Sequence, residues 1–168
     1  PLKSTSLYAT YANNFTTNTG LDIFGAALKP SVIDQYEAGV KNDFFGGRLS
    51  TNLTYNVTKN SDLAQTALFL ADGTVNSNTN IKEFSGSTRS DSFEIDVTGT
   101  LAKGLNFIAG YAYNFMRFTK TLEGSGAVEG VRLVGTTKNT ANGTLFYTVQ
   151  NGKIKGLKLG ASAFYTGD

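Results

Sequence analysis

The segment Leu49-Ser50-Thr51-Asn52-Leu53-Thr54-Tyr55-Asn56-Val57-Thr58 alternates in polarity with a period of two. Leucine, tyrosine and valine occupy four of its five odd positions, and serine, asparagine and threonine fill the even ones. Successive side chains of a β-strand point to opposite faces of its sheet. The segment therefore predicts a strand with one apolar face and one polar face.

The same alternation recurs along most of the chain. It is clear in four further segments and weaker in two, and together they predict about seven strands. The four clear segments are Phe93–Leu101, Leu105–Phe115, Leu145–Val149 and Leu157–Tyr165, and the two weaker ones are Leu7–Phe15 and Tyr36–Val40.

The connections between these segments alternate between short and long. Short turns are predicted at Asp43–Gly47, Ala102–Gly104 and Gln150–Gly156, and long polar loops at Thr16–Asp34, Asn60–Thr88 and Lys120–Thr137. Short turns at one end and long loops at the other are typical of outer-membrane barrels, whereas Greek-key sandwiches mix loop lengths. We therefore predict an all-β fold, an antiparallel up-and-down meander.

Composition excludes several classes of function. The 168 residues include no Cys and no His, which removes disulfides, thiolate nucleophiles, Ser-His-Asp catalysis and most zinc sites. Net charge is only +2, so no nucleic-acid surface is indicated. No apolar run approaches the roughly 20 residues of a transmembrane helix, a test that alternating barrel strands escape. We expect no enzyme activity, no catalytic residue, no metal site and no cofactor.

A few charged residues could still carry chemistry. Glu94 and Asp96 share the polar face of one predicted strand, with Asp91 close by. Paired carboxylates can transfer protons or bind calcium, but wetted residues of a polar face are the favoured interpretation. Arg48 and Arg89 are placed near strand beginnings, as residues of a rim.

The long loops and the two faces give further expectations. Phe24, Phe69 and Phe84 are placed in long loops, where they could contact a ligand or pack within the loop itself. On the strands, one set of side chains is predicted to face lipid: Leu53, Tyr55, Phe107, Tyr111, Leu145 and Leu159. The opposite set, Asn52, Glu94, Asp96 and Asn106, is predicted to face a lumen.

One run of residues resembles a known family. Gln35-Tyr36-Glu37-Ala38-Gly39-Val40-Lys41, followed by Gly47-Arg48-Leu49-Ser50, resembles TonB-dependent outer-membrane siderophore receptors of the ferrichrome-receptor type. Three later stretches, Ser90–Gly99, Gly104–Tyr113 and Lys155–Asp168, are similar to strands of the C-terminal part of their barrel. The resemblance covers nearly the whole chain.

The resemblance implies a barrel of about 22 strands with a plugged lumen. It implies the outer membrane of a Gram-negative bacterium, contact with membrane lipid, and import of a ferric siderophore powered by the TonB energy-coupling complex. Residues 1–168 are then expected to form part of the barrel, with the plug domain, the first strands and the terminal strand outside them. The siderophore and the residues that contact it stay unassigned.

Two other readings remain open at this point. A secreted or surface β-sandwich, used as an adhesin-type binding module, would also show alternating strands. An outer-membrane enzyme barrel such as a lipase would need a serine with a base, and the sequence contains no His. If the barrel hypothesis is correct, the two end strands, Leu7–Phe15 and Leu157–Tyr165, expose unpaired backbone groups and require neighbouring strands.

Overall fold

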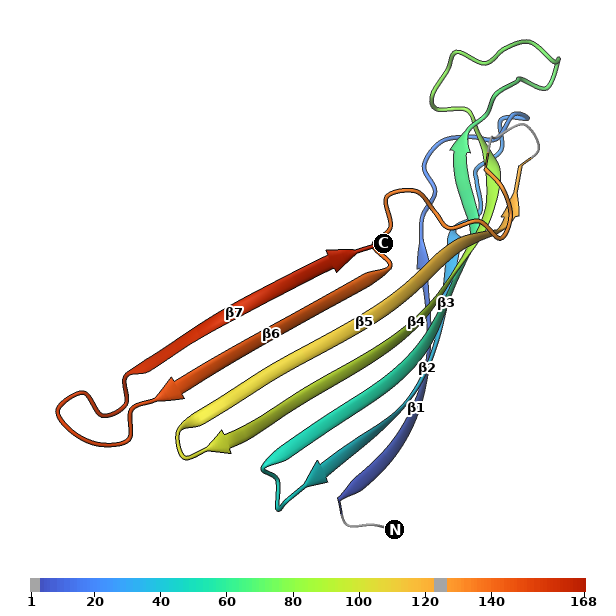
Figure 1. Ribbon diagram of the computed structural model, residues 1–168. Helices are drawn as coiled ribbons and strands as arrows, with labels where there is room; N and C mark the ends of the chain where they lie inside the picture. The colour runs from blue at the N-terminus through green and yellow to red at the C-terminus, as the bar shows by residue number, and fades with distance from the viewer. Residues whose placement is uncertain (1–3, 123–126) are drawn as a thin grey trace.

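The computed structural model describes residues 4–122 and 127–168, which form seven strands in a single sheet. The strands are β1 (Thr5–Thr16), β2 (Ser31–Phe44), β3 (Leu49–Thr66), β4 (Lys82–Ala102), β5 (Leu105–Thr121), β6 (Asn139–Thr148) and β7 (Lys158–Gly167). Each pairs with the next in antiparallel fashion, so their spatial order is their chain order (Figure 1). The predicted meander is confirmed, and the described residues contain no second sheet of the kind a sandwich needs. Among them, no helix is long and apolar enough to cross a membrane.

The short connections lie at one end of the sheet and the long ones at the other (Figure 1). The three predicted turns are confirmed, between Phe44 and Leu49, between Ala102 and Leu105, and between Thr148 and Lys158. The β4–β5 turn is only Lys103-Gly104, and Gly104 adopts a φ of 81°, which glycine tolerates best because it lacks a Cβ. The alternation of connection lengths thus orients the sheet, with a turn end and a loop end.

The β3–β4 hairpin continues well beyond its predicted limits. β3 runs to Thr66 and β4 begins at Lys82, so the predicted loop Asn60–Thr88 is too long and the observed loop covers residues 67–81. Register shifts interrupt the pairing after Asn60, and Asp62 there has a φ of 58°. Such an irregularity breaks strict alternation, which explains why the pattern was lost before the strand ended.

The apolar side chains of neighbouring strands align on one face. Leu53 lies opposite Ile95, which lies opposite Tyr111. Phe107 lies opposite Leu145, and Leu159 opposite Tyr147. The sheet is curved (Figure 1), and we call this apolar side its convex face. The predicted grouping of the six lipid-facing candidates on one side of the sheet is confirmed.

The other side, the concave face, holds most of the residues that are shielded from solvent. Among the described residues, the buried polar side chains are Ser31, Thr54, Thr88 and Ser92, which all lie on this face, and Ala67 in the β3–β4 loop is the buried apolar one. A curved sheet crowds side chains on its inner side. The sheet therefore has no apolar core, and strand pairing with polar contacts holds it together.

Candidate functional site

Hydroxyl and amide side chains form a connected network on the concave face. The carboxamide oxygen of Asn114 on β5 accepts hydrogen bonds from the hydroxyls of Ser90 and Ser92 on β4, the latter at 3.0 Å. The face contains no buried side-chain nitrogen or oxygen without a partner among the described residues. Because these groups satisfy one another, the hydrogen bonds stabilise this arrangement of the polar wall.

A second polar group on the same face, centred on Tyr8, spans three strands. Its ring lies over Gly39 of β2, where an added Cβ would come within 2.5 Å of the ring, and its hydroxyl reaches Thr54 Oγ1 on β3 at 2.7 Å. Lys41 Nζ lies 5.0 Å from the ring centroid. Glycine at position 39 therefore creates the space that lets an aromatic ring lie flat against the wall.

The acidic candidates separate onto two faces. Glu94 and Asp96 both lie on the concave face, as predicted, and Asn56 Nδ2 lies 3.5 Å from Glu94 Oε1. Asp91 lies on the convex face instead, opposite Val57 and Phe115. In the part of the chain that the structure describes, no group of three acidic or other ligating side chains could hold a metal ion.

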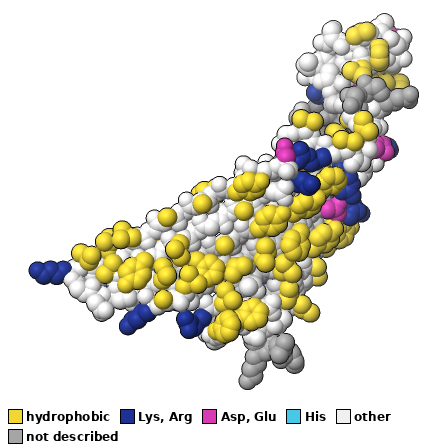
Figure 2. All heavy atoms as spheres, viewed as in Figure 1, with side chains coloured by type: hydrophobic (Ala, Val, Ile, Leu, Met, Phe, Trp, Pro, Cys, Tyr) yellow, Lys and Arg dark blue, Asp and Glu magenta, His cyan; other side chains and the backbone are white. Residues whose placement is uncertain are grey.

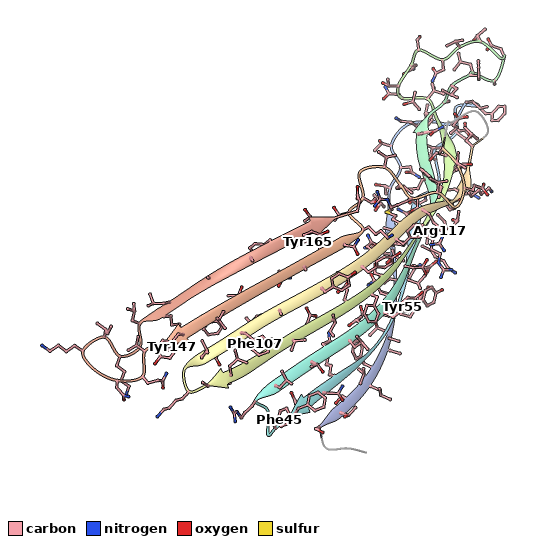
Figure 3. All side chains as sticks on the ribbon, in the orientation of Figure 1. Phe45, Tyr55, Phe107, Arg117, Tyr147 and Tyr165 are labelled. Atoms are coloured by element: carbon pink, nitrogen blue, oxygen red, sulfur yellow. The ribbon has the colours of Figure 1, made fainter. Side chains whose placement is uncertain are left out.

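Apolar and aromatic side chains cover the convex face. Figure 2 shows them spread from the turn end up to a cluster of charged residues near the loop end. In Figure 3, Phe45, Phe107 and Tyr147 lie toward the turn end, and Tyr55 and Tyr165 lie nearer the loop end. An apolar band with aromatic residues at both borders is the pattern of a barrel wall in a bilayer.

The charged cluster is organised around Asp91. Its carboxylate accepts hydrogen bonds from Arg89 Nη2 at 2.7 Å and Arg117 Nη1 at 2.6 Å, and from the Tyr55 hydroxyl at 2.9 Å. Arg117 lies at the loop-end border of the apolar band in Figure 3. Arg89 was expected near the beginning of a strand, but β4 begins at Lys82, so that prediction is wrong. Arg48 does precede β3 directly, as expected.

Two of the long loops are joined to each other. The amide of Leu21 donates to the carbonyl of Asn80 at 3.0 Å, and the amide of Lys82 donates to the carbonyl of Leu21 at 2.7 Å. Phe24 and Phe69 project from these loops, 80% and 54% exposed. Phe84 lies in β4, so its predicted place in a loop is wrong. The joined loops thus present two aromatic side chains beyond the sheet.

A local polar turn shapes the β3–β4 loop. The Asp72 carboxylate accepts hydrogen bonds from the hydroxyl of Thr74 at 2.6 Å and from its amide at 3.0 Å. These bonds, the hydroxyl bond above all, favour the ionised form and hold the pKa of Asp72 below its usual value. This loop conformation therefore depends on a charged carboxylate.

Comparison with known proteins agrees with this geometry. A family described as TonB dependent receptor-like, beta-barrel, matches residues 1–168. The metal-pseudopaline receptor CntO of Pseudomonas aeruginosa is 31% identical over 163 residues, 96% of this chain and 21% of the receptor. The ferrioxamine B receptor of Salmonella typhimurium is 27% identical over 158 residues, 94% of this chain and 21% of that protein.

Solved structures show the same fold. The pyoverdine outer membrane receptor FpvA of Pseudomonas aeruginosa superposes with a TM-score of 0.74 at 23% identity, over 98% of this chain and 23% of that one. BauA, the ferric preacinetobactin receptor of Acinetobacter baumannii, superposes with a TM-score of 0.75 at 20% identity, over 98% and 24%. The chain spans about a fifth of the length of the curated relatives it matches. With the family match over its whole length, this seven-stranded sheet belongs to the β-barrel of the TonB-dependent receptors.

Proposed function

We propose that the chain forms part of the wall of a closed outer-membrane barrel that binds ferric siderophores and imports them. The observation that carries this proposal is the family match over residues 1–168, on a sheet with one apolar and one polar face. The family is located in the outer membrane of Gram-negative bacteria, and its members are receptors rather than enzymes. That this chain catalyses no reaction stays a prediction.

In this proposal the two faces meet different solvents. The convex face, with Leu53 and Tyr111, contacts the acyl chains of the bilayer. The concave face, with Ser92, Asn114 and Glu94, lines a hydrated lumen, where hydroxyl, amide and carboxylate groups exchange hydrogen bonds with water at little cost. A polar ferric chelate passing through such a lumen would meet hydrogen-bonding groups on β3 and β4, and on β5 to β7 also apolar side chains that include Ile108 and Phe164.

The joined loops are the part of this chain that we assign to the first contact with the ligand. They lie at the loop end of the sheet, which in outer-membrane barrels faces the outside of the cell. Phe24 and Phe69 offer exposed aromatic surface there. Aromatic rings pack well against the large, partly apolar frame of a metal chelate.

We assign energy coupling to the TonB complex, as the family name indicates. Concentrative import across the outer membrane needs an external energy source, and no residue of this chain is assigned to the contact with the complex. Support comes from the named relatives, which are receptors for pseudopaline, ferrioxamine B and pyoverdine. Which chelate this receptor recognises is left to the experiment.

The test is iron uptake by the source bacterium with and without the gene for the full-length protein. Cells are given radioactive iron as a panel of hydroxamate, catecholate and mixed siderophores, each with and without a proton uncoupler. We expect deletion to abolish uptake of at least one chelate, the plasmid-borne gene to restore it, and the uncoupler to block transport while surface binding remains. Unchanged uptake of every chelate in the deletion strain would contradict the proposal.

A further inference from the structure

A positively charged hollow opens on the convex face, at the loop-end border of the apolar band. It has a volume of about 270 Å³ and lies between β3, β4 and β5. Three cations line it, Lys59, Arg89 and Lys120, together with hydroxyls that include those of Ser61 and Ser87. No carboxylate is among the described residues that line it. The hollow is outside the lumen and has no part in the proposed import of a chelate.

The register places like charges side by side at this level. Lys59 lies directly opposite Arg89, and Arg89 directly opposite Arg117. Like charges in directly opposite positions of an antiparallel pair destabilise a sheet. Asp91 bridges the two guanidinium groups at 2.7 and 2.6 Å and offsets their repulsion, but it forms no ion pair with the lysine.

Neither lysine of the hollow has a carboxylate within ion-pair distance among the described residues. Asp34 lies opposite Lys59, yet its carboxylate instead accepts hydrogen bonds from Tyr11 at 2.7 Å and Asn13 at 2.8 Å. Lys59 Nζ lies 5.6 Å from the centroid of the Tyr36 ring. Among the described residues neither Lys59 nor Lys120 forms an ion pair, and both are exposed. Positive charge at this level therefore exceeds negative charge, because the four cations Lys59, Arg89, Arg117 and Lys120 face only the two carboxylates of Asp34 and Asp91.

The donors of the hollow suit a phosphate group. Arg89 uses Nε and Nη2 for Asp91, and its Nη1 forms no hydrogen bond to a carboxylate among the described residues. A guanidinium, two ammonium groups and neighbouring hydroxyls together provide the charge-assisted hydrogen bonds that phosphate oxygens accept most strongly. A carboxylate ligand would use fewer of these donors because it has only two oxygens.

The depth of the hollow identifies the source of the phosphate. The row on the turn side of Lys59 and Arg89 carries Tyr36, Val57, Asp91 and Phe115, and Phe15 on β1 lies one row beyond Lys59 toward the loops. One row is two residues, or about 6.6 Å along a strand and less along the normal of a tilted one. The headgroup layer on each side of a bilayer is roughly 5–7 Å thick. The hollow thus lies at headgroup depth on the loop side of the membrane.

We propose that Lys59, Arg89 and Lys120 bind a phosphate of an outer-leaflet lipid headgroup, whose acyl chains then cover the apolar band below. The bound phosphate would supply the negative charge that the row of cations lacks. It would also fix a specific lipid against β3, β4 and β5 at the border where the strands leave the membrane.

The experiment measures lipid binding by the purified full-length receptor in zwitterionic nanodiscs doped with diphosphoryl lipid A. The test variant is Lys59→Gln with Lys120→Gln, because both side chains are exposed and lack ion pairs, so the Arg89–Asp91–Arg117 group stays intact. The matched control is Lys103→Gln with Lys153→Gln, which removes the same charge from exposed turns at the other end. Heat-modifiable gel mobility confirms that each variant is folded.

We expect the test variant to bind lipid A about tenfold more weakly, since two charge-assisted contacts are lost, and the control variant to match the wild type. Adding Ser87→Asp to the test variant, which places a carboxylate in the hollow, should weaken its binding of lipid A further. Dephosphorylated lipid A should bind as weakly to the wild type as lipid A does to the test variant. Equal loss in both lysine pairs, or no loss in the test variant, would overturn the proposal. Displacement of lipid A by equimolar inorganic phosphate would overturn the lipid source.

Discussion

The convex face of the sheet exposes Tyr55 and Phe93, whereas the concave face of the same two strands, β3 and β4, holds Thr54 and Ser92 buried. In a water-soluble domain this relation is reversed, because apolar side chains gather where water is excluded. The difference shows that no apolar core holds this sheet together. Its order comes from strand pairing and from polar contacts on the concave face, and in the proposed function the convex face meets hydrocarbon.

The largest expected effect comes from placing a positive charge on each face of β3 at the same depth. Leu53→Arg on the convex face should destabilise the full-length receptor by about 2–4 kcal/mol, because a guanidinium near the middle of the bilayer is poorly solvated. Asn52→Arg on the concave face should have little effect, because its charge stays hydrated. Denaturant unfolding in lipid bilayers measures both, and equal losses would contradict the assignment of faces.

A second comparison uses two glycines without strained backbone. Gly39 on the concave face has the Tyr8 ring 2.5 Å from an added Cβ, whereas Gly143 on the convex face has no neighbour within 4 Å. Gly39→Val should cost about 1–3 kcal/mol through overpacking, and Gly143→Val far less. Adding Tyr8→Ala to Gly39→Val should recover part of the loss. If the two glycine variants unfold at the same denaturant concentration, the aromatic packing across β1–β3 does not stabilise the wall.

A third comparison lies within the concave face. Asn114→Ala removes the acceptor shared by Ser90 and Ser92 and should cost about 1–2 kcal/mol, because one hydroxyl of the pair is buried. Asn142 on β6 is exposed and forms no side-chain hydrogen bond among the described residues, so Asn142→Ala should be nearly neutral. Thermal melts of both variants test this, and an equal shift would show that the network contributes nothing of its own.

The smallest expected effect concerns the β3–β4 loop. The pKa of Asp72 is lowered in the folded loop by the hydroxyl and amide of Thr74, so its contribution is present above the unfolded pKa of about 3.9 and is lost as pH falls through the folded value. Hydrogen exchange should show the amide of Thr74 losing protection in acid while β3 and β4 stay protected. Asp72→Asn should weaken the pH dependence. Protection that is independent of pH would contradict this view of the loop.

The alternation of apolar and polar residues predicts the strands whose two faces differ in polarity. Between Leu49 and Thr58 apolar and polar residues alternate, so the sequence alone predicts the strand, its two faces and its neighbouring turn. Beyond Asn60 both strands of the β3–β4 hairpin extend past the apolar band, and the alternation of apolar and polar residues ends there. The bulge at Asp62 then shifts the faces, and Phe84 is misplaced in a loop for the same reason.

The charged cluster could not be predicted because it depends on register. Asp91 and Arg117 are 26 positions apart in sequence, and they meet only when β4 and β5 pair as observed. The sequence places Asp91 close to Glu94 and Asp96, and its odd position assigns it to the opposite face when parity is counted from Phe93. The closeness of the two lysines to Arg89 has no comparable signal in the sequence.

The most direct test of the central claim is a spin-label scan of β3 in the full-length receptor, reconstituted in nanodiscs. The sequence contains no Cys, so single cysteines can be introduced within this chain at each position from Ser50 to Val57. Oxygen reports contact with lipid, and a water-soluble nickel complex reports contact with water. We expect oxygen access at positions 51, 53, 55 and 57 and nickel access at the even positions. The absence of alternation, or an alternation of opposite phase, would contradict it.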